Sequence, residues 1–311
     1  MTLPRVVAFG GGHGLAATLL AVKRLTDNVT AIVTVADDGG SSGRLRREFG
    51  CLPPGDLRMA LAALCGDHAE GRLWADVLQT RFQGDGPLAG HALGNLLIAG
   101  LWSRDPDPVV GLDHVARLVE ARGRVLPMSS VPLQITADVT RSDSLHRGEA
   151  GTVTGQAEIA VTPHDVVAVH LTPADPPVCP EVLTAIAQAD YLVFGPGSWF
   201  TSVVPHLLVP ALAGAIVASD AKKVVIMNLA AAEETAGFTP SHHIEVLAEH
   251  EPRLRLTTVI ADPRFVDDPL LEPCVNGLGA RLLVGPVGMR DGSPRHDPNL
   301  LIGVLAQVFN L

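Results

Sequence analysis

Two glycine-rich turns contain the residues of this sequence best suited to bind phosphate. The first, GGGHG at residues 10–14, follows an apolar strand at 5–9 and opens an apolar helix at about 15–25. The second, GPGS at residues 195–198, again joins a strand to a helix. Glycine lets main-chain N–H groups approach a phosphate closely, and a helix N-terminus adds a favourable dipole. We therefore expect both turns to contact one diphosphate at a switch point of a parallel sheet.

Each turn also has a simpler interpretation. The first lacks the complete GxGxxG fingerprint because Leu15 fills the last position, so a tight turn without a ligand is the alternative. In the second, Thr201 or Ser202 is a natural N-cap for the helix that follows. The amide donors at that helix start nevertheless favour a phosphate role.

Three acidic residues are candidate metal or ribose ligands. Asp37 and Asp38 end a second strand at 30–36, and Asp37 lies 23 residues beyond Gly14, where dinucleotide folds often bind a ribose hydroxyl. Two adjacent carboxylates suit Mg²⁺ equally well, and capping of the loop is the alternative. Asp56 begins a predicted helix, so it is either a third ligand or that helix's N-cap.

Polar residues near these carboxylates extend the candidate site. Ser41, Ser42 and Arg44 lie in the segment TVADDGGSSGRLR at 34–46, whose small residues and arginines suit an anion or a metal. His91 lies at the start of another apolar helix, whose first amides are expected to face the same ligand. A hydrogen-bonding role at the helix terminus is the alternative for His91.

The elements that must position these residues follow an alternating pattern. After the β-loop-α-β opening, residues 39–55 are predicted to form a long ordered loop. Apolar periodicity then predicts helices at 56–66, 72–82, 91–103, 108–122, 181–188, 201–219 and 241–250, and strands at 190–194, 223–228 and 256–260. Residues 124–176 instead show the alternation of antiparallel strands. The sequence predicts one α/β domain over 1–311, a Rossmann-like, doubly wound, mostly parallel sheet with a small β-rich insertion at 124–176.

Composition narrows the classes of partner. The 311 residues are 47% hydrophobic, 18% charged and carry a net charge of −10, so no basic field favours nucleic acid or an anionic membrane. The longest apolar run, at 203–218, is shorter than a bilayer span and is expected to be a buried helix. Four scattered cysteines and the absence of a signal peptide indicate a cytoplasmic protein. Apolar helices make a homodimer reasonable.

The chain resembles the CofD/YvcK family, and is closer to its YvcK-type gluconeogenesis factor branch than to the phospho-lactyl transferase CofD. The matching segments are GGGHG at 10–14, TVADDGGSSGRLR at 34–46, LPPGDLRMAL at 52–61, GHALGNLL at 90–97, FGPGSWFTSVVPHLLV at 194–209 and RHDP at 295–298. They span most of the chain in order. The resemblance implies a Rossmann-like fold, a cytoplasmic role in central carbon metabolism and cell-envelope shape, and binding of UDP-sugars such as UDP-N-acetylglucosamine.

The resemblance also adds Asn95 and Arg295 as ligand contacts. The expected nucleotide- and phosphate-binding residues are Gly10, Gly11, Gly12, His13, Gly14, Ser41, Ser42, Arg44, His91, Asn95, Gly195, Gly197, Ser198, Thr201 and Arg295. Two positions depart from the family pattern. His13 stands where many members have threonine, and residues 230–235 read AAAEET where a TQPGET-like run is common.

Three functions are compatible with these residues. The favoured one is a regulatory protein that binds a nucleotide sugar and acts on a partner protein. The second is a Mg²⁺-dependent transferase of CofD type, in which Asp37 and Asp38 hold the metal and the glycine turns hold the diphosphate. The third is an NAD-binding protein, which the opening β-loop-α-β and Asp37 suggest. GDP is a further possible ligand, and the catalytic residues are not identifiable from the sequence.

Overall fold

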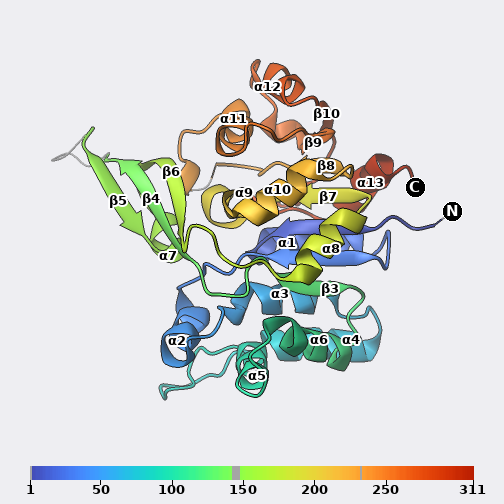
Figure 1. Cartoon of the computed structure of the whole chain (residues 1–311). Helices are drawn as coiled ribbons and strands as arrows, with labels where there is room; N and C mark the ends of the chain where they lie inside the picture. Colours follow the sequence, from blue (N-terminus) through green and yellow to red (C-terminus); the bar gives the residue numbers. More distant parts are fainter. Residues whose placement is uncertain (1, 142–147, 232) are drawn as a thin grey trace.

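A seven-stranded parallel sheet forms the centre of the molecule (Figure 1), with strand order β10-β9-β8-β7-β1-β2-β3. The structure is a computed structural model that describes residues 2–141, 148–231 and 233–311. The strands are β1 (Val6–Gly10), β2 (Val29–Val33), β3 (Arg124–Pro127), β7 (Tyr191–Phe194), β8 (Lys222–Ile226), β9 (Thr258–Ala261) and β10 (Arg281–Val284). Every neighbouring pair is parallel, which confirms the predicted Rossmann-like α/β fold.

The direction of strand addition reverses at β1. The chain proceeds from β1 to β2 and β3 on one side, and from β7 to β8, β9 and β10 on the other. β1 therefore pairs with β7, whose residues lie far away in sequence, with Phe9 opposite Phe194. Such a reversal opens a crevice at the carboxyl ends of the strands, where ligands bind in folds of this kind.

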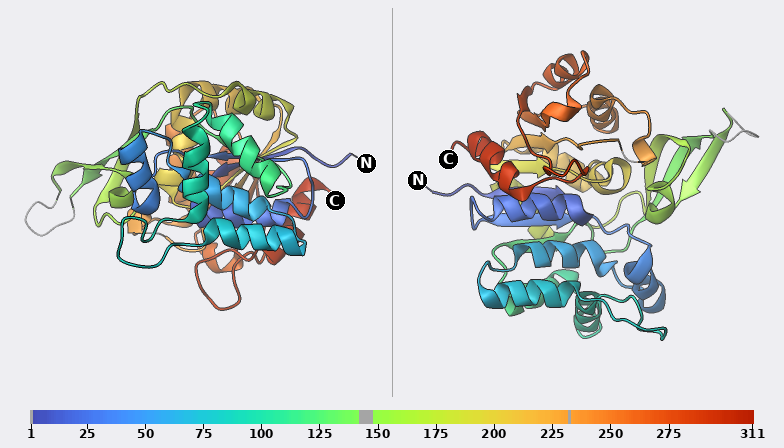
Figure 2. Two further views of the ribbon diagram at one scale, coloured as in Figure 1. Left: turned by 90° about the horizontal axis from the view of Figure 1, so that it is seen from below. Right: turned by 180° about the vertical axis from the view of Figure 1, so that it is seen from behind.

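Helices cover both faces of the sheet. α1 (Gly12–Val22), α3 (Pro54–Leu64) and α13 (Pro298–Phe309) lie on one face, and α8 (Pro180–Gln188) and α10 (Pro210–Ala218) on the other (Figure 2). The remaining helices are α2 (Gly40–Phe49), α4 (Ala69–Gln79), α5 (Leu93–Trp102), α6 (Pro108–Leu118), α7 (Gln156–Ile159), α9 (Pro205–Leu208), α11 (Pro240–His250) and α12 (Leu271–Gly277). Proline opens several of these helices, where its missing N–H costs no hydrogen bond.

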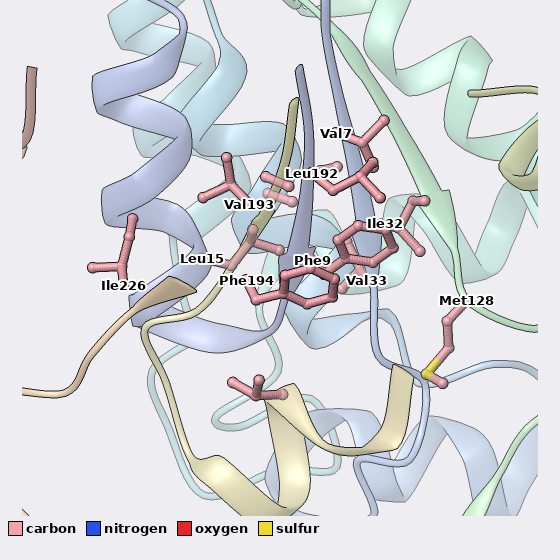
Figure 3. Close-up of a cluster of buried hydrophobic side chains, with 14 of the residues drawn as sticks. Val7, Phe9, Leu15, Ile32, Val33, Met128, Leu192, Val193, Phe194 and Ile226 are labelled. Atoms are coloured by element: carbon pink, nitrogen blue, oxygen red, sulfur yellow. The ribbon is translucent and has the colours of Figure 1, made fainter. Parts of the chain in front are cut away.

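The core lies between the sheet and these helices. Residues of β1, β7 and β9 are buried along their whole length, as expected for parallel strands covered on both faces. Phe9 stacks on Phe194 with ring centroids 4.7 Å apart (Figure 3). His206 packs edge-on against Phe9. This packing joins β1 to β7 at the strand ends from which the two glycine turns start.

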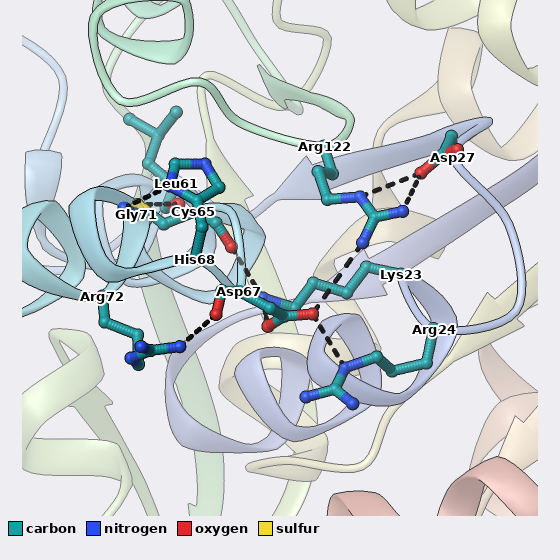
Figure 4. Close-up of polar contacts among 10 residues, drawn as sticks. All are labelled: Lys23, Arg24, Asp27, Leu61, Cys65, Asp67, His68, Gly71, Arg72 and Arg122. Atoms are coloured by element: carbon teal, nitrogen blue, oxygen red, sulfur yellow. Dashed lines mark hydrogen bonds and ion pairs between the residues drawn. The ribbon is translucent and has the colours of Figure 1, made fainter.

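An ionic cluster fixes the far end of α1 (Figure 4). Lys23 is buried, and its ammonium donates to the Cys65 carbonyl at 2.7 Å and lies 3.2 Å from the Asp67 carboxylate. Asp67 also contacts the Arg24 guanidinium at 2.9 Å. Because Cys65 follows α3, the cluster ties the C-terminal ends of α1 and α3 together and steadies the helix that carries the first turn.

A three-stranded antiparallel sheet projects from the carboxyl edge of the main sheet (Figure 1). It consists of β4 (Gln134–Thr140), β5 (Ala150–Thr154) and β6 (Asp165–Thr172) in the order β5-β4-β6. The predicted β-rich insertion thus begins later than residue 124, because residues 124–127 form β3 and pair with β2.

Two further predictions need correction. The loop expected at 39–55 contains helix α2, which is capped by Gly39 and ends at Gly50 in the left-handed conformation with φ 64°. The single helical stretch expected at 201–219 is divided into a π-helical turn η1 (Trp199–Val203), α9 and α10 by Pro205 and Pro210. Within the described residues, no helix is both long and apolar enough to span a membrane.

Candidate functional site

The two glycine turns lie against each other at the carboxyl edge of the sheet. A Cβ placed on Gly14 would lie 2.1 Å from the Pro196 carbonyl oxygen, so only glycine allows this approach. The Gly195 N–H donates to the Phe9 carbonyl at 3.2 Å, and the Thr18 hydroxyl donates to the Gly195 carbonyl at 3.0 Å. Their main chains therefore form one continuous surface beside the N-terminus of α1.

A cavity of about 520 Å³ opens beside this surface. Five of the expected binding residues line it, namely His13, Gly14, Gly197, Ser198 and Arg295. Leu20 of α1, Leu229 and Pro298 give the cavity an apolar wall. A second hollow, of about 610 Å³, lies at the opposite, amino edge of β7 and β8 near Asp190 and Lys222, far from both turns.

Asn228 maintains the conformation of the second turn, a role that sequence analysis did not identify and that only its place after β8 could have suggested. Its Oδ1 accepts the Gly197 N–H at 3.0 Å and its Nδ2 donates to the Gly197 carbonyl at 2.9 Å. Both polar groups of Gly197 are thus directed toward one side chain. The Asn228 carboxamide thus pairs with the Gly197 main chain as a neighbouring strand would.

Asn228→Ala is expected to lower the free energy of unfolding by about 1–2 kcal/mol, because it leaves two main-chain groups of the turn unpaired. Asn228→Asp retains the acceptor for the Gly197 N–H and should lose less. Urea denaturation of the three proteins measures both effects. Equal stability of wild type and Asn228→Ala would show that the turn keeps its shape without this side chain.

A buried carboxylate binds the start of the helical segment that follows the second turn. Glu234 is 2% exposed, and its Oε1 accepts the Ser198 hydroxyl at 2.7 Å and the Phe200 N–H at 3.2 Å. Burial raises the pKa of Glu234. Thr201 lies fully buried against the Ser198 hydroxyl and does not line the cavity. The Phe200 amide expected to face a phosphate is therefore bound to Glu234 here.

Asp37 and Asp56 meet beside the first turn. Asp56 accepts the Gly12 N–H, and a Cβ on Gly11 would lie 2.4 Å from its Oδ2. Burial of this carboxylate, and then repulsion from Asp37, raises the pKa of Asp56 to about 7. Asp56 is not an N-cap, because α3 begins at Pro54 and Asp56 lies within its first turn.

Asp38 points away from its neighbour toward the projecting sheet. Its Oδ1 accepts the Ala157 N–H of α7 at 3.1 Å, and a Cβ on Gly155 would lie 2.2 Å from its Oδ2. Asp38 is therefore structural, and Asp37 both caps the loop, through the Gly39 N–H at 2.9 Å, and interacts electrostatically with Asp56. In the part of the chain that the structure describes, no group of three or more His, Cys, Asp and Glu side chains is arranged to hold a metal.

A third group of expected site residues forms a buried hydrogen-bond network between helix starts. The Ser41 hydroxyl lies 2.9 Å from His91 Nδ1 and accepts from Asn95 Nδ2 at 3.0 Å. Ser42 accepts the Gly55 N–H at 2.9 Å, and Arg44 donates to the Ala89 carbonyl at 2.7 Å. Burial lowers the pKa of His91. These residues join the N-termini of α2, α3 and α5 and lie outside the cavity lining.

The loop that carries Arg295 is fixed by a buried carboxylate that sequence analysis did not identify. Asp262 follows β9 and accepts the N–H groups of Val287 at 3.0 Å and Gly288 at 2.9 Å. Burial alone would raise its pKa, but these bonds and those from Arg264 hold the pKa of Asp262 well below its usual range. Gly288 pairs with His296, so the loop folds back and presents Arg295 to the cavity.

Comparison with known proteins places the chain in a family. The family model described as "2-phospho-L-lactate transferase CofD" matches residues 6–276. A relative from Mycobacterium tuberculosis (strain ATCC 25618 / H37Rv), named "Putative gluconeogenesis factor", is 50% identical over 305 residues, covering 96% of this chain and 89% of the relative. The "Gluconeogenesis factor" of Bacillus subtilis (strain 168) is 35% identical over 268 residues, covering 86% of this chain and 81% of that protein.

A solved structure agrees with these relatives. The crystal structure of a UPF0052 family protein from Bacillus halodurans matches with a TM-score of 0.85 and 34% identity, covering 98% of this chain and 99% of that one. The match thus extends over both glycine turns and the loop that carries Arg295. Because the family model and full-length relatives agree, the chain belongs to the CofD/YvcK family, together with the proteins named gluconeogenesis factors.

Proposed function

We propose that the protein binds a nucleotide sugar, such as UDP-N-acetylglucosamine, in the cavity beside the two glycine turns. The contact between Gly14 and Pro196 carries this proposal, because it joins two phosphate-type turns into one surface at the N-terminus of α1. The Gly12, Gly195 and Gly197 N–H groups are bound within the protein, so the proposed diphosphate contacts are the other first-turn amides of α1, at His13 and Gly14, together with the helix dipole. In the cell we expect a cytoplasmic regulator of central carbon metabolism and envelope growth that acts through a partner protein.

The cavity suits the remaining parts of such a ligand. Its volume of about 520 Å³ falls within the range of small-molecule sites. The apolar wall of Leu20, Leu229 and Pro298 is suited to the faces of a nucleobase or a sugar ring. The Arg295 guanidinium supplies the positive charge that a diphosphate requires.

Asp37 and Asp56 are the residues that would hold Mg²⁺, and they lie beside the first turn and outside the cavity lining. Mg²⁺ commonly uses one or two carboxylates together with ligand phosphates, and it keeps several waters. Like-charge repulsion between the two carboxylates is relieved when a cation binds, so the raised pKa of Asp56 is consistent with such a role. The metal would neutralise phosphate charge, while Asp38 remains bound to Ala157.

A metal-dependent transferase is the second candidate function, and the CofD description of the matching family favours it. In that function the Ser198 hydroxyl, which donates to the buried Glu234 carboxylate at 2.7 Å, would be the candidate nucleophile with Glu234 as its base. Monitoring the nucleotide sugar by ³¹P NMR with the protein and Mg²⁺ separates the two candidates, since only a transferase consumes it.

Arg295→Ala is expected to weaken UDP-N-acetylglucosamine binding by about 10- to 100-fold, because a charge-assisted hydrogen bond contributes about 1.5–3 kcal/mol. Arg290→Ala in the same loop is the matched control, since Arg290 is exposed and does not line the cavity. Calorimetric titration with UDP-N-acetylglucosamine, UDP-glucose, GDP and NAD, with and without Mg²⁺, tests the ligand class. Tight NAD binding without UDP-sugar binding would replace the proposal with a dinucleotide site.

A further inference from the structure

His296 occupies a defined position in the cavity wall. It lies beside Arg295, is 9% exposed, and its Nε2 is 3.0 Å from the Met227 carbonyl at the end of β8. The bridge to Gly288 and the Asp297 N–H bond to the Val287 carbonyl at 2.8 Å hold its main chain. Val287 and Gly288 are in turn bound to Asp262, so the ring is supported by two strand ends.

The protonation state of this ring follows from its partner. A carbonyl oxygen only accepts hydrogen bonds, so Nε2 must carry the proton. Burial lowers the pKa of His296 to about 4, so the ring is neutral at physiological pH. A neutral imidazole with its proton on Nε2 has a lone pair on Nδ1. In the described part of the chain, no hydrogen-bond partner satisfies Nδ1.

Apart from the exposed His13 at the start of α1, the other polar side chains of the cavity offer different chemistry. Arg295 is a donor only. The Asn228 carboxamide is bound to both polar groups of Gly197, and the Ser198 hydroxyl is bound to Glu234. His296 therefore contributes a side-chain acceptor that internal hydrogen bonds leave available at this wall.

We propose that His296 determines ligand specificity by accepting, through Nδ1, a hydrogen bond from an N–H or O–H group of the bound nucleotide sugar. The inference rests on the proposed function and adds a chemical requirement to it. A ligand without a donor at this point leaves the acceptor desolvated and unpaired, which is how polar sites reject analogues. The rigid loop makes this discrimination effective, because its position is set before the ligand arrives.

Two substitutions separate recognition from support of the loop. In asparagine, Oδ1 is two bonds from Cβ, as is Nδ1 of histidine, so His296→Asn keeps the acceptor and loses the Met227 bond. In glutamine, Nε2 is three bonds from Cβ, as is Nε2 of histidine, so His296→Gln keeps the Met227 bond and loses the acceptor. We expect His296→Gln to weaken UDP-N-acetylglucosamine binding about tenfold, and His296→Asn to remain within about threefold of wild type.

Calorimetric titration with UDP-N-acetylglucosamine and with UDP gives the decisive comparison, with thermal unfolding of each variant as the check on folding. If His296→Gln loses affinity tenfold for both probes, the donor lies in the nucleoside part of the ligand. If it loses affinity for UDP-N-acetylglucosamine alone, the donor lies in the sugar. Equal or greater loss in His296→Asn than in His296→Gln would overturn the proposal and leave a loop-supporting role. Wild-type affinity in both variants would also overturn it. Failure of the wild type to bind either probe would instead refute the nucleotide-sugar function itself.

Discussion

Gly14→Ala is expected to abolish measurable ligand binding and to destabilise the fold by about 3 kcal/mol, because the added methyl group collides with main chain. The new Cβ would lie 2.1 Å from the Pro196 carbonyl oxygen, 2.5 Å from its carbon and 2.9 Å from Gly197 Cα. None of these atoms belongs to a flexible side chain that could rotate away. The two turns must separate, and the surface proposed for the diphosphate separates with them.

Gly100→Ala is the matched control for this substitution. Gly100 lies in α5, is exposed, and has no atom within 4 Å of the position that a Cβ would take. Alanine there should leave binding unchanged and leave stability equal or up to about 1 kcal/mol higher. Urea denaturation and titration with UDP-N-acetylglucosamine measure both variants. Wild-type binding by Gly14→Ala would mean that the contact between the turns plays no part in the site.

Asp56→Asn is expected to stabilise the ligand-free protein at pH 8 and to have little effect near pH 4. The pKa of Asp56 rises from 3.8 to about 7 on folding, so the folded state binds more protons between these values. Stability therefore falls as the pH rises from about 4 to 7, and the penalty is complete above pH 7. This rise in pKa corresponds to at most about 4 kcal/mol of additional unfolding free energy for Asp56→Asn at pH 8, and we expect about 2 kcal/mol.

Denaturation of wild type and Asp56→Asn at pH 4, 6 and 8 without Mg²⁺ measures this difference. The asparagine can still accept the Gly12 N–H through Oδ1, so the comparison isolates the charge. Asp38→Asn is the matched control. Asp38 is the neighbour of Asp37 in the sequence, but its carboxylate accepts a hydrogen bond from the Ala157 N–H. A difference between wild type and Asp56→Asn that does not change with pH would show that charge at Asp56 has no energetic cost.

The parallel sheet was predictable because its strands are short apolar runs that alternate with helical periodicity. Helix α2 was not predictable by that route, since Leu45 is its single buried apolar side chain and its first residues are glycine and serine, which are poor helix formers. Its helical form depends on Ser42, which binds Gly55 of α3, and such a contact has no local sequence signal.

The candidate site was predictable only in part. Glycine turns next to strands are local patterns, so the neighbourhood of Gly14 and Gly197 followed from the order of elements. Asn228, Asp262 and His296 carry equally specific contacts, but each is a single polar residue whose partners lie in segments that follow other strands. The spacing of Asp37 and Asp38 also could not show that the two carboxylates have different surroundings. Asp37 interacts with Asp56 and Asp38 binds Ala157, and both of these residues are distant in the sequence.

The walls of the cavity come from segments that are distant in the chain, from His13 through Gly197 and Asn228 to Pro298. A growing polypeptide on the ribosome consequently has no complete binding pocket until residue 298 has been translated. Ligand stabilises only a state that can bind it, by RT ln(1 + [L]/Kd). A ligand bound in this cavity would then protect molecules that contain residue 298 from proteases and leave chains terminated before it unprotected.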